Sequence, residues 1–314
     1  MLKRVAVVGS LNCDFVMRVP RRPQKGETVL GTSFDIFVGG KGNNQALACA
    51  RAGAQVAMIG RIGADHFGSM IAAKLAESGV DCEFLFRDPM VSTGVADILI
   101  DADGDNSICV APQANARLSR RDIEAAAPVL ERAGVVLVQL EIPYETAAAA
   151  VQLAKASGAT VVLNPAPAPP DGKLPAELLS HVDILVPNRT EVELLTGKPA
   201  GDLAGAIDAA RLLQRLGPKQ VILTMGERGA LRVDEMGIAT VTPAFEVTIQ
   251  DTTAAGDAFC GALVAALASG KPLPDAVVWG SAGGALACTK LGAEPSLPMR
   301  EELERLVASR RAAT

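Results

Sequence analysis

Short apolar, β-branched runs alternate along the chain with longer segments of helical periodicity. The runs predict buried strands at residues 4–9, 56–60, 135–140, 160–163, 183–186 and 220–224. The intervening segments predict helices, and so does the C-terminal part, at residues 43–52, 67–77, 146–157, 203–216, 253–267, 275–289 and 301–307. Such alternation is typical of βαβ units, so we expect an α/β fold with a mostly parallel sheet covered by helices on both faces.

Two regions depart from this alternation. Residues 14–37 contain two prolines and a Gly-Glu-Thr-Val turn but no helical period. Residues 93–110 show an extended run, a turn at 103–106 and a second extended run, which predicts a hairpin. We expect the two regions to form a small sheet apart from the main one.

Length and composition narrow the class of protein. The chain has 314 residues, 49% of them apolar and 21% charged, which fits one large globular domain with an inserted element, or two domains. A net charge of −5 argues against nucleic-acid and membrane-surface partners. The six scattered cysteines and two histidines form no zinc motif. Reduced thiols, together with the lack of a secretion signal or an apolar run of transmembrane length, predict a cytoplasmic protein.

The strongest chemical signal lies where small residues precede an acidic residue and a helical segment. Ala254, Ala255 and Gly256 lead into Asp257. A helix start offers unpaired N–H groups and the positive end of the dipole, and small side chains let an anion come close. Asp257 would then lie beside the anion as a general base. An ordinary aspartate near a helix N-terminus is the alternative interpretation, and the pattern alone leaves both open.

The stretch Asp-Thr-Thr-Ala-Ala-Gly-Asp at 251–257 resembles the C-terminal signature of the PfkB carbohydrate-kinase family. The block Val-Gly-Gly-Lys-Gly-Asn-Asn-Gln-Ala at 38–46 resembles the family's N-terminal sugar-binding signature. Further blocks follow the order of the ribokinase-like branch, at 12–14, 26–28, 139–141, 164–167 and 187–191. The resemblance implies a three-layer α/β/α core with a small β-sheet lid. The core would comprise residues 1–11, 39–90 and 112–314, and the lid residues 12–38 and 91–111.

The same resemblance implies an ATP-dependent kinase that phosphorylates D-ribose at O5. Asp257 would be the general base, and the N–H groups of residues 254–257 would form the anion hole. Neither a P-loop motif nor the protein-kinase motif set occurs in the chain. The side chains and glycines carried over as sugar contacts are Asn12, Asp14, Gly39, Gly40, Lys41, Asn44, Glu141 and Asp257.

The nucleotide side carries fewer matching residues. The resemblance assigns ATP to Asn188, Glu191, Thr224, Gly226, Glu227, Gly229, Gly256 and Ser281. Asn188 and Glu191 also have the spacing of a capping box, and they can serve both as a cap and, through water, near Mg²⁺.

A monovalent-cation site is the last ligand set that the resemblance implies. For K⁺ it assigns Asp251, Thr253, Ala287, Lys290 through its backbone oxygen, Gly292 and Ser296. Hard oxygen ligands suit an alkali cation. The alternative for Asp251 is a turn-forming aspartate before two threonines.

Other functions stay open at this point. Another kinase of the family could act on deoxyribose, a nucleoside or a sugar acid. A sugar acid calls for two basic groups, and the proposed pocket offers Lys41 alone. A nucleoside calls for aromatic surface, and Phe15 and Phe37 are the candidates in the lid. A catalytically silent sugar sensor would not need Asp257 and its anion hole.

Three residues depart from the family pattern, and the lid has a further expected role. Arg189, Gln113 and Cys260 replace residues that are common in the ribokinase-like branch. We assign none of them to chemistry, although Gln113 lies near the lid hinge. The resemblance also implies a homodimer formed through the lid.

Overall fold

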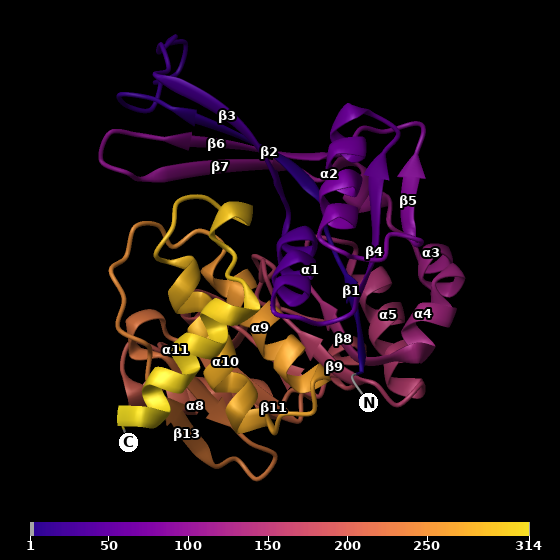
Figure 1. Ribbon diagram of the computed structural model, residues 1–314, viewed down its shortest axis with the longest axis vertical. Coiled ribbons are helices and arrows are strands. Elements are labelled where there is room, and N and C mark those ends of the chain that lie inside the picture. The colour runs from indigo at the N-terminus through magenta and orange to yellow at the C-terminus, as the bar shows by residue number, and fades with distance from the viewer. Residues whose placement is uncertain (1–2, 314) are drawn as a thin grey trace.

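The computed structural model describes residues 3–313, and within them the main sheet has nine strands (Figure 1). Their order is β13-β12-β11-β10-β9-β8-β1-β4-β5. Neighbouring strands are parallel except for β12, which is antiparallel to both of its neighbours. The bounds are β1 (Arg4–Val8), β4 (Val56–Gly63), β5 (Leu85–Asp88), β8 (Ala133–Val138), β9 (Thr160–Leu163), β10 (Ile184–Leu185), β11 (Gln220–Thr224), β12 (Ala230–Val233) and β13 (Ala239–Thr242).

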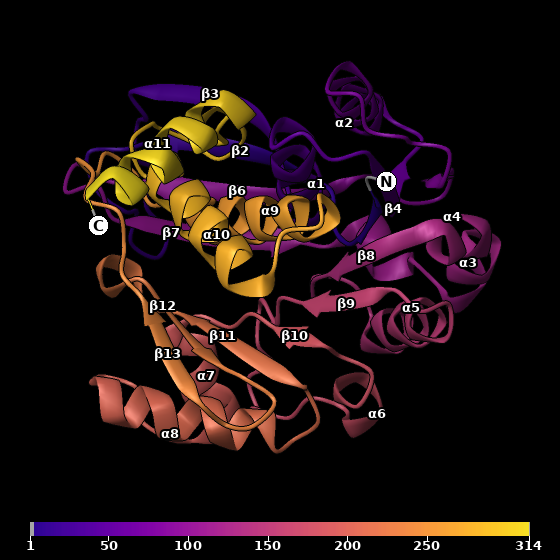
Figure 2. The same cartoon turned by 60° about the horizontal axis from the view of Figure 1, so that its bottom comes forward.

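Helices cover both faces of this sheet, so the expected three-layer α/β/α fold is confirmed (Figure 2). Side chains alternate between the two cores: Val5 and Val7 face one, and Ala6 and Val8 face the other. The first layer contains α1 (Lys41–Arg51), α2 (His66–Glu77), α9 (Ala255–Ala268), α10 (Leu273–Ala287) and α11 (Arg300–Ala313). The second contains α3 (Arg120–Ala125), α4 (Ala127–Arg132), α5 (Tyr144–Ala156), α6 (Ala176–Leu179), α7 (Arg189–Thr196) and α8 (Leu203–Gln214).

Small residues bring two helices of the first layer unusually close together. A Cβ added to Gly261 on α9 would lie 2.3 Å from the Cβ of Ala48 on α1. The helices can approach this closely because neither residue carries a larger side chain there. The start of α1 therefore packs beside the start of α9, and this contact positions the site described below.

The expected small sheet is present, with strand order β3-β2-β6-β7. Its strands are β2 (Asn12–Arg18), β3 (Ser33–Gly39), β6 (Gly94–Ile100) and β7 (Asn106–Ala111), and β6 and β7 form the expected hairpin. β2 is parallel to β6 and antiparallel to β3. The sheet extends away from the main one (Figure 1). Its strands lie in the connections from β1 to α1 and from β5 to α3.

Several boundaries differ from the sequence-based prediction. The strand expected at 135–140 ends at Val138, which leaves Gln139 and Glu141 beyond the strand end. The helix expected from 43 begins at Lys41, because Gly40 adopts a φ of 88° immediately before it. Three strands of the main sheet lacked a clear pattern in the sequence: the antiparallel β12, its neighbour β13 at one edge, and the short β5 at the other edge. In the described part of the chain, no helix is both long and apolar enough to cross a membrane.

Candidate active site

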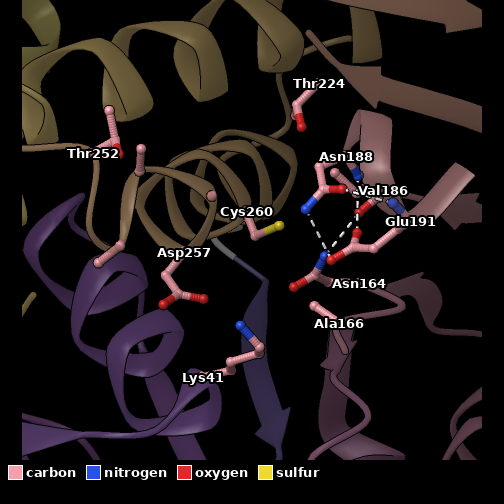
Figure 3. Close-up of a pocket in the computed structure, with 13 residues that line it drawn as sticks. Lys41, Asn164, Ala166, Val186, Asn188, Glu191, Thr224, Thr252, Asp257 and Cys260 are labelled. Atoms are coloured by element: carbon pink, nitrogen blue, oxygen red, sulfur yellow. Dashed lines mark hydrogen bonds between the residues drawn. The ribbon is translucent and has the colours of Figure 1, made fainter. Parts of the chain in front are cut away.

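A cavity of about 180 Å³ lies where several main-sheet strands end (Figure 3). Parallel sheets commonly bind ligands at the carboxyl ends of their strands. The residues that line it come from both predicted halves of the site and are Lys41, Asn164, Ala166, Val186, Asn188, Glu191, Thr224, Thr252, Ala254, Ala255, Gly256, Asp257 and Cys260. Sugar-side and nucleotide-side candidates therefore share one cavity.

Asp257 is the third residue of α9, and its carboxylate is buried. Asn44 Nδ2 donates to Oδ2 at 3.1 Å, and Gln45 Nε2 donates to Oδ1 at 2.9 Å. Burial raises the pKa of Asp257, while Lys41 and these two amides lower it and leave the net direction upward. The carboxylate is therefore oriented by a donor on each oxygen and faces the cavity that Lys41 also enters (Figure 3).

The start of α9 forms one wall of the cavity. Ala254 adopts a left-handed conformation with φ 59°, and no side chain caps the helix. The Ala255 N–H donates to Thr252 O at 3.2 Å, whereas Gly256 and Asp257 belong to the first turn, whose N–H groups have no intrahelical acceptor. A Cβ added to Gly256 would meet no atom within 4 Å, so an anion has room to approach.

Glu141 lies just beyond the end of β8, and its side chain bonds the first turn of α1. Its Oε2 accepts from the Lys41 N–H at 3.1 Å and from Ser10 Oγ at 2.5 Å. Lys41 Nζ lies 4.0 Å from Glu141 Oε1. Burial lowers the pKa of Lys41, but Asp257 and Glu141 raise it further, so the ammonium group stays charged.

Asp14 is a buried carboxylate on β2 of the small sheet. Its Oδ1 has no hydrogen-bond partner within the described protein. Burial raises the pKa of Asp14 to about 7, and the charges of Glu141 and Asp257 act in the same direction. A Cβ on Gly39 would lie 2.0 Å from Asp14 Oδ2, so any larger residue there would displace the Asp14 carboxylate.

Asn12 occupies the junction between the two sheets. Its Oδ1 accepts from Asn115 Nδ2 at 2.7 Å, and Asn115 also bonds both backbone groups of Leu11. A Cβ on Gly40 would lie 2.8 Å from the Asn12 N atom, which explains the glycine there. Of the expected sugar set, Lys41, Asn44, Glu141 and Asp257 are joined directly, by hydrogen bonds or a charge contact, whereas Asn12 is held mainly by Asn115.

The nucleotide-side residues divide into two groups. Asn188 and Glu191 form the capping box of α7, with bonds of 2.8 and 2.9 Å, and both also line the cavity. Burial raises the pKa of Glu191 to about 7. Thr224 ends β11 and lines the cavity too. The remaining members, which do not line it, are Gly226, Glu227 and Gly229 at the turn after β11 and the buried Ser281 on α10.

The residues expected to hold K⁺ lie on two loops and the end of α10. Asp251 accepts from the Thr253 N–H at 2.9 Å and from the Gly292 N–H at 2.9 Å, so it forms the expected turn and also ties the loops together. Ser296 Oγ donates to Ala293 O, Lys290 Nζ pairs with Glu302, and Ala287 ends α10. Burial raises the pKa of Asp251, but the bonds from Thr253 and Gly292 outweigh it and lower the pKa. The described residues contain no cluster of three or more His, Cys, Asp or Glu side chains suited to a metal.

Some residues at the site could not be recognised from the sequence. Gln45 and Asn164 lie within recognised blocks, but their contacts across the site are visible only in the fold. Cys260, expected to stand apart from the chemistry, lines the same cavity as Asp257 because the two are three residues apart on α9. Gln113 adopts φ 46°, a conformation that favours the glycine common there, and Arg189 is exposed at the start of α7.

Comparison with known proteins identifies close similarity over nearly the whole chain. The family model described as pfkB family carbohydrate kinase matches residues 2–300. The chain is 40% identical to a ribokinase of Haemophilus influenzae over 302 residues, 96% of this chain and 97% of the relative. It is 38% identical to a deoxyribokinase of Salmonella typhi, covering 82% and 83%. The structure of Arabidopsis thaliana ribokinase complexed with ribose and ATP superposes with a TM-score of 0.90 at 31% identity, covering 98% and 99%.

Proposed function

The chain belongs to the pfkB family of carbohydrate kinases, and from that membership we propose that it is an ATP-dependent ribokinase. It transfers the terminal phosphoryl group of ATP to O5 of D-ribose. The observation that carries the proposal is the shared cavity, in which the buried carboxylate of Asp257 lies beside the open start of α9. Relatives named ribokinase, at 36 to 40% identity over at least 96% of this chain, support ribose as the substrate.

The proposed chemistry assigns each group one task. Asp257 accepts the proton of the attacking hydroxyl, a contribution worth roughly 10²- to 10⁴-fold in rate. The N–H groups at the start of α9 stabilise the charge on the transferring phosphoryl group. Lys41 neutralises part of that charge, since its ammonium group enters the cavity beside Asp257. Asp14, Asn44 and Glu141 hold the sugar hydroxyls, because carboxylates bind neutral hydroxyl donors strongly and the Asn44 amide adds a neutral hydrogen-bonding group.

Two metal ions belong to this proposal. Glu191, with Asn188, would hold Mg²⁺ through water, and the fit rests on a desolvated carboxyl at the cavity wall whose ionised form a cation would favour. Bound with ATP, Mg²⁺ would neutralise phosphate charge. Asp251 and the neighbouring loop oxygens would hold K⁺, and the fit rests on a carboxylate that stays ionised among hard oxygen donors.

The rival sugar classes receive less support. The Phe15 ring packs against Phe34 and Phe67, with ring centroids 6.0 and 5.4 Å away. It lies on the face of β2 opposite Asp14, because neighbouring side chains of a strand alternate between its faces. Phe37, which pairs with Asp14 across β2 and β3, is the remaining lid candidate for stacking a nucleobase, so the nucleoside alternative depends on one half-buried ring. Lys41 is the basic residue among those that line the cavity, which disfavours a sugar acid. Deoxyribose remains the second candidate because of the deoxyribokinase relative.

A substrate panel tests the proposal directly. ADP release would be measured with ribose, 2-deoxyribose, a hexose, a nucleoside and a keto-deoxy sugar acid, each against ATP. We expect the highest kcat/KM with ribose. A higher value for any other acceptor would contradict the ribokinase assignment, and release with none of them would favour the silent sensor.

Assembly and location complete the proposal. Exposed apolar side chains on the small sheet, Phe34, Ile36, Ile108 and Val110, support a homodimer through the lid. Light scattering would give twice the chain mass, and Ile108→Asp would shift it toward the monomer. The six cysteines are free thiols, which supports a reducing cytoplasm.

A further inference from the structure

A row of buried amides leads from Asp257 into the middle of the molecule. Gln45 on α1 is fully buried, and its Nε2 donates to Asp257 Oδ1 at 2.9 Å and to Asn164 Oδ1 at 3.0 Å. Gln139, also fully buried, donates from Nε2 to Gln45 Oε1 at 2.6 Å. Both N–H groups and the oxygen of the Gln45 amide are therefore used.

The direction of these hydrogen bonds follows from the carboxylate. An ionised carboxylate only accepts, so Gln45 must turn its NH₂ group toward Asp257 and its oxygen toward Gln139. The reverse orientation would set three acceptors against one another at Gln45, Asp257 and Asn164. Asn164 is held in turn by its Nδ2, which donates to Val186 O at 2.8 Å. The row thus has one favourable arrangement while Asp257 is ionised.

The burial of Gln139, at the far end of the row, is energetically unfavourable. Gln139 Oε1 is buried without a hydrogen-bond partner in the described protein. A Cβ on Gly9 would lie 1.8 Å from this oxygen, so the absence of a side chain at Gly9 leaves room for the Gln139 amide. Burying an amide oxygen without a partner destabilises a fold, and an apolar side chain of similar length would avoid that loss. The amide is therefore poorly explained by packing alone.

We propose that Gln45, oriented by Gln139, is a positioning residue that keeps Asp257 ionised and aimed into the cavity. The inference rests on the proposed role of Asp257 as general base. Burial raises the pKa of Asp257, and the Gln45 amide is one of the groups that oppose this. The charged or titratable groups that also act on Asp257 are Lys41, Glu141, Asp14, Glu191 and Cys260.

Methionine substitutions test the row because they keep the length and remove the donor. In Gln45→Met, we expect the acid limb of the kcat–pH profile to move up by about one to two pH units, since a bond to a charged group is lost. The plateau kcat should fall about tenfold as the carboxylate loses its orientation, while KM for ATP stays unchanged. Gln139 does not contact Asp257 directly but bonds Gln45. In Gln139→Met, the acid limb should therefore also move to higher pH, by a smaller amount than in Gln45→Met.

Gln152→Met is the matched control, because Gln152 bonds Glu177 at the outer surface. Its profile should superimpose on that of the wild-type enzyme. A Gln45→Met kcat that falls equally at every pH would show a packing role and overturn the inference. Should Gln45→Met fail to fold by near-ultraviolet circular dichroism, the acid limb of Gln139→Met decides instead.

Failure of the proposed general-base role of Asp257 gives a different result, whereas failure of the ribose assignment would appear in the substrate panel. In the first case Asp257→Asn would retain wild-type kcat, whatever the glutamines do. Failure of the inference alone would leave Asp257→Asn inactive and the acid limb of both glutamine variants in its wild-type position.

Discussion

The sugar-side and nucleotide-side candidate residues differ in their burial. On the sugar side, Asp14, Asn44 and Asp257 are each less than a tenth exposed, and Asn44 and Asp257 bond each other directly. On the nucleotide side, Glu191 and Ser281 are buried as well, but Gly226 and Glu227 lie in an exposed turn that does not line the cavity. A buried polar group left without its partner costs far more than an exposed one. Single substitutions should therefore damage sugar handling more than ATP handling.

The largest effect is expected at Asp257, whose carboxylate lies between the proposed sugar and phosphate positions. Asp257→Asn should lower kcat by roughly 10²-fold or more, because an amide cannot accept the hydroxyl proton. ATP affinity, measured by calorimetry, should barely change. A variant that keeps near wild-type kcat would remove Asp257 from the chemistry, and circular dichroism would verify that the protein is folded.

The second largest loss of activity is expected at the sugar-side carboxylates. Asp14→Ala and Glu141→Ala each remove a charged acceptor worth about 1.5–3 kcal/mol, so kcat/KM for sugar should fall roughly 10- to 150-fold. KM for ATP should remain within a small factor of the wild-type value. Equal losses for both substrates would indicate a structural role and would break the comparison.

A several-fold effect is expected from K⁺. Adding KCl to enzyme in Na⁺-free Tris buffer should raise activity, because a cation among Asp251 and its loop would order the start of α9. Asp251→Ala should abolish the rise. Choline chloride at equal ionic strength is the control, and equal activation by choline would mean that screening alone is responsible.

On the nucleotide side, we expect a smaller change. Glu227→Ala should alter KM for ATP by about two- to threefold at most, since exposed polar contacts contribute little. KM for sugar should stay the same in steady-state assays. A loss approaching that of Asp14→Ala would show that the exposed turn is as critical as the buried side.

The last prediction concerns stability. The pKa of Asp14 is about 7 in the folded protein, against 3.8 for an ordinary aspartate, and burial is the main cause. The folded state therefore holds its proton more tightly, and stability falls as the pH rises from about 4 to 7. Asp14→Asn should raise the Tm of the ligand-free protein by several degrees at pH 8 and by much less at pH 4. The exposed Glu227→Gln should leave the Tm unchanged at both values.

Much of this site could be predicted from sequence because the reacting groups lie in short local blocks. Asp257 lies in one helix start, and Lys41 follows two glycines, of which Gly39 closely approaches the Asp14 side chain and Gly40 closely approaches the backbone of residues 10–12. The alternation of strands with helices was enough to predict the layered arrangement of the core. Strand ends were less certain, since β8 stops at Val138 with apolar Leu140 still to come.

The supporting residues could not be predicted in the same way. Gln45 meets Asp257, 212 positions along the chain, only because α1 and α9 pack closely through Gly261 and Ala48. A glutamine inside an alanine-rich helix has no local signal for that contact. Cys260 escaped for a related reason, because a thiol on a buried helix has the same local pattern whether it faces a cavity or the core.

The small sheet has a consequence for how this fold can diversify. Its four strands lie in two connections of the main sheet. Asn115, which follows β7 in the second connection, bonds Leu11 and Asn12 at the start of the first. Residues 19–32 and 101–105 connect strands of the small sheet, so insertions or replacements there would remodel the proposed lid without shifting a strand of the core. New acceptor preferences could thus arise by loop exchange at a constant phosphoryl-transfer centre.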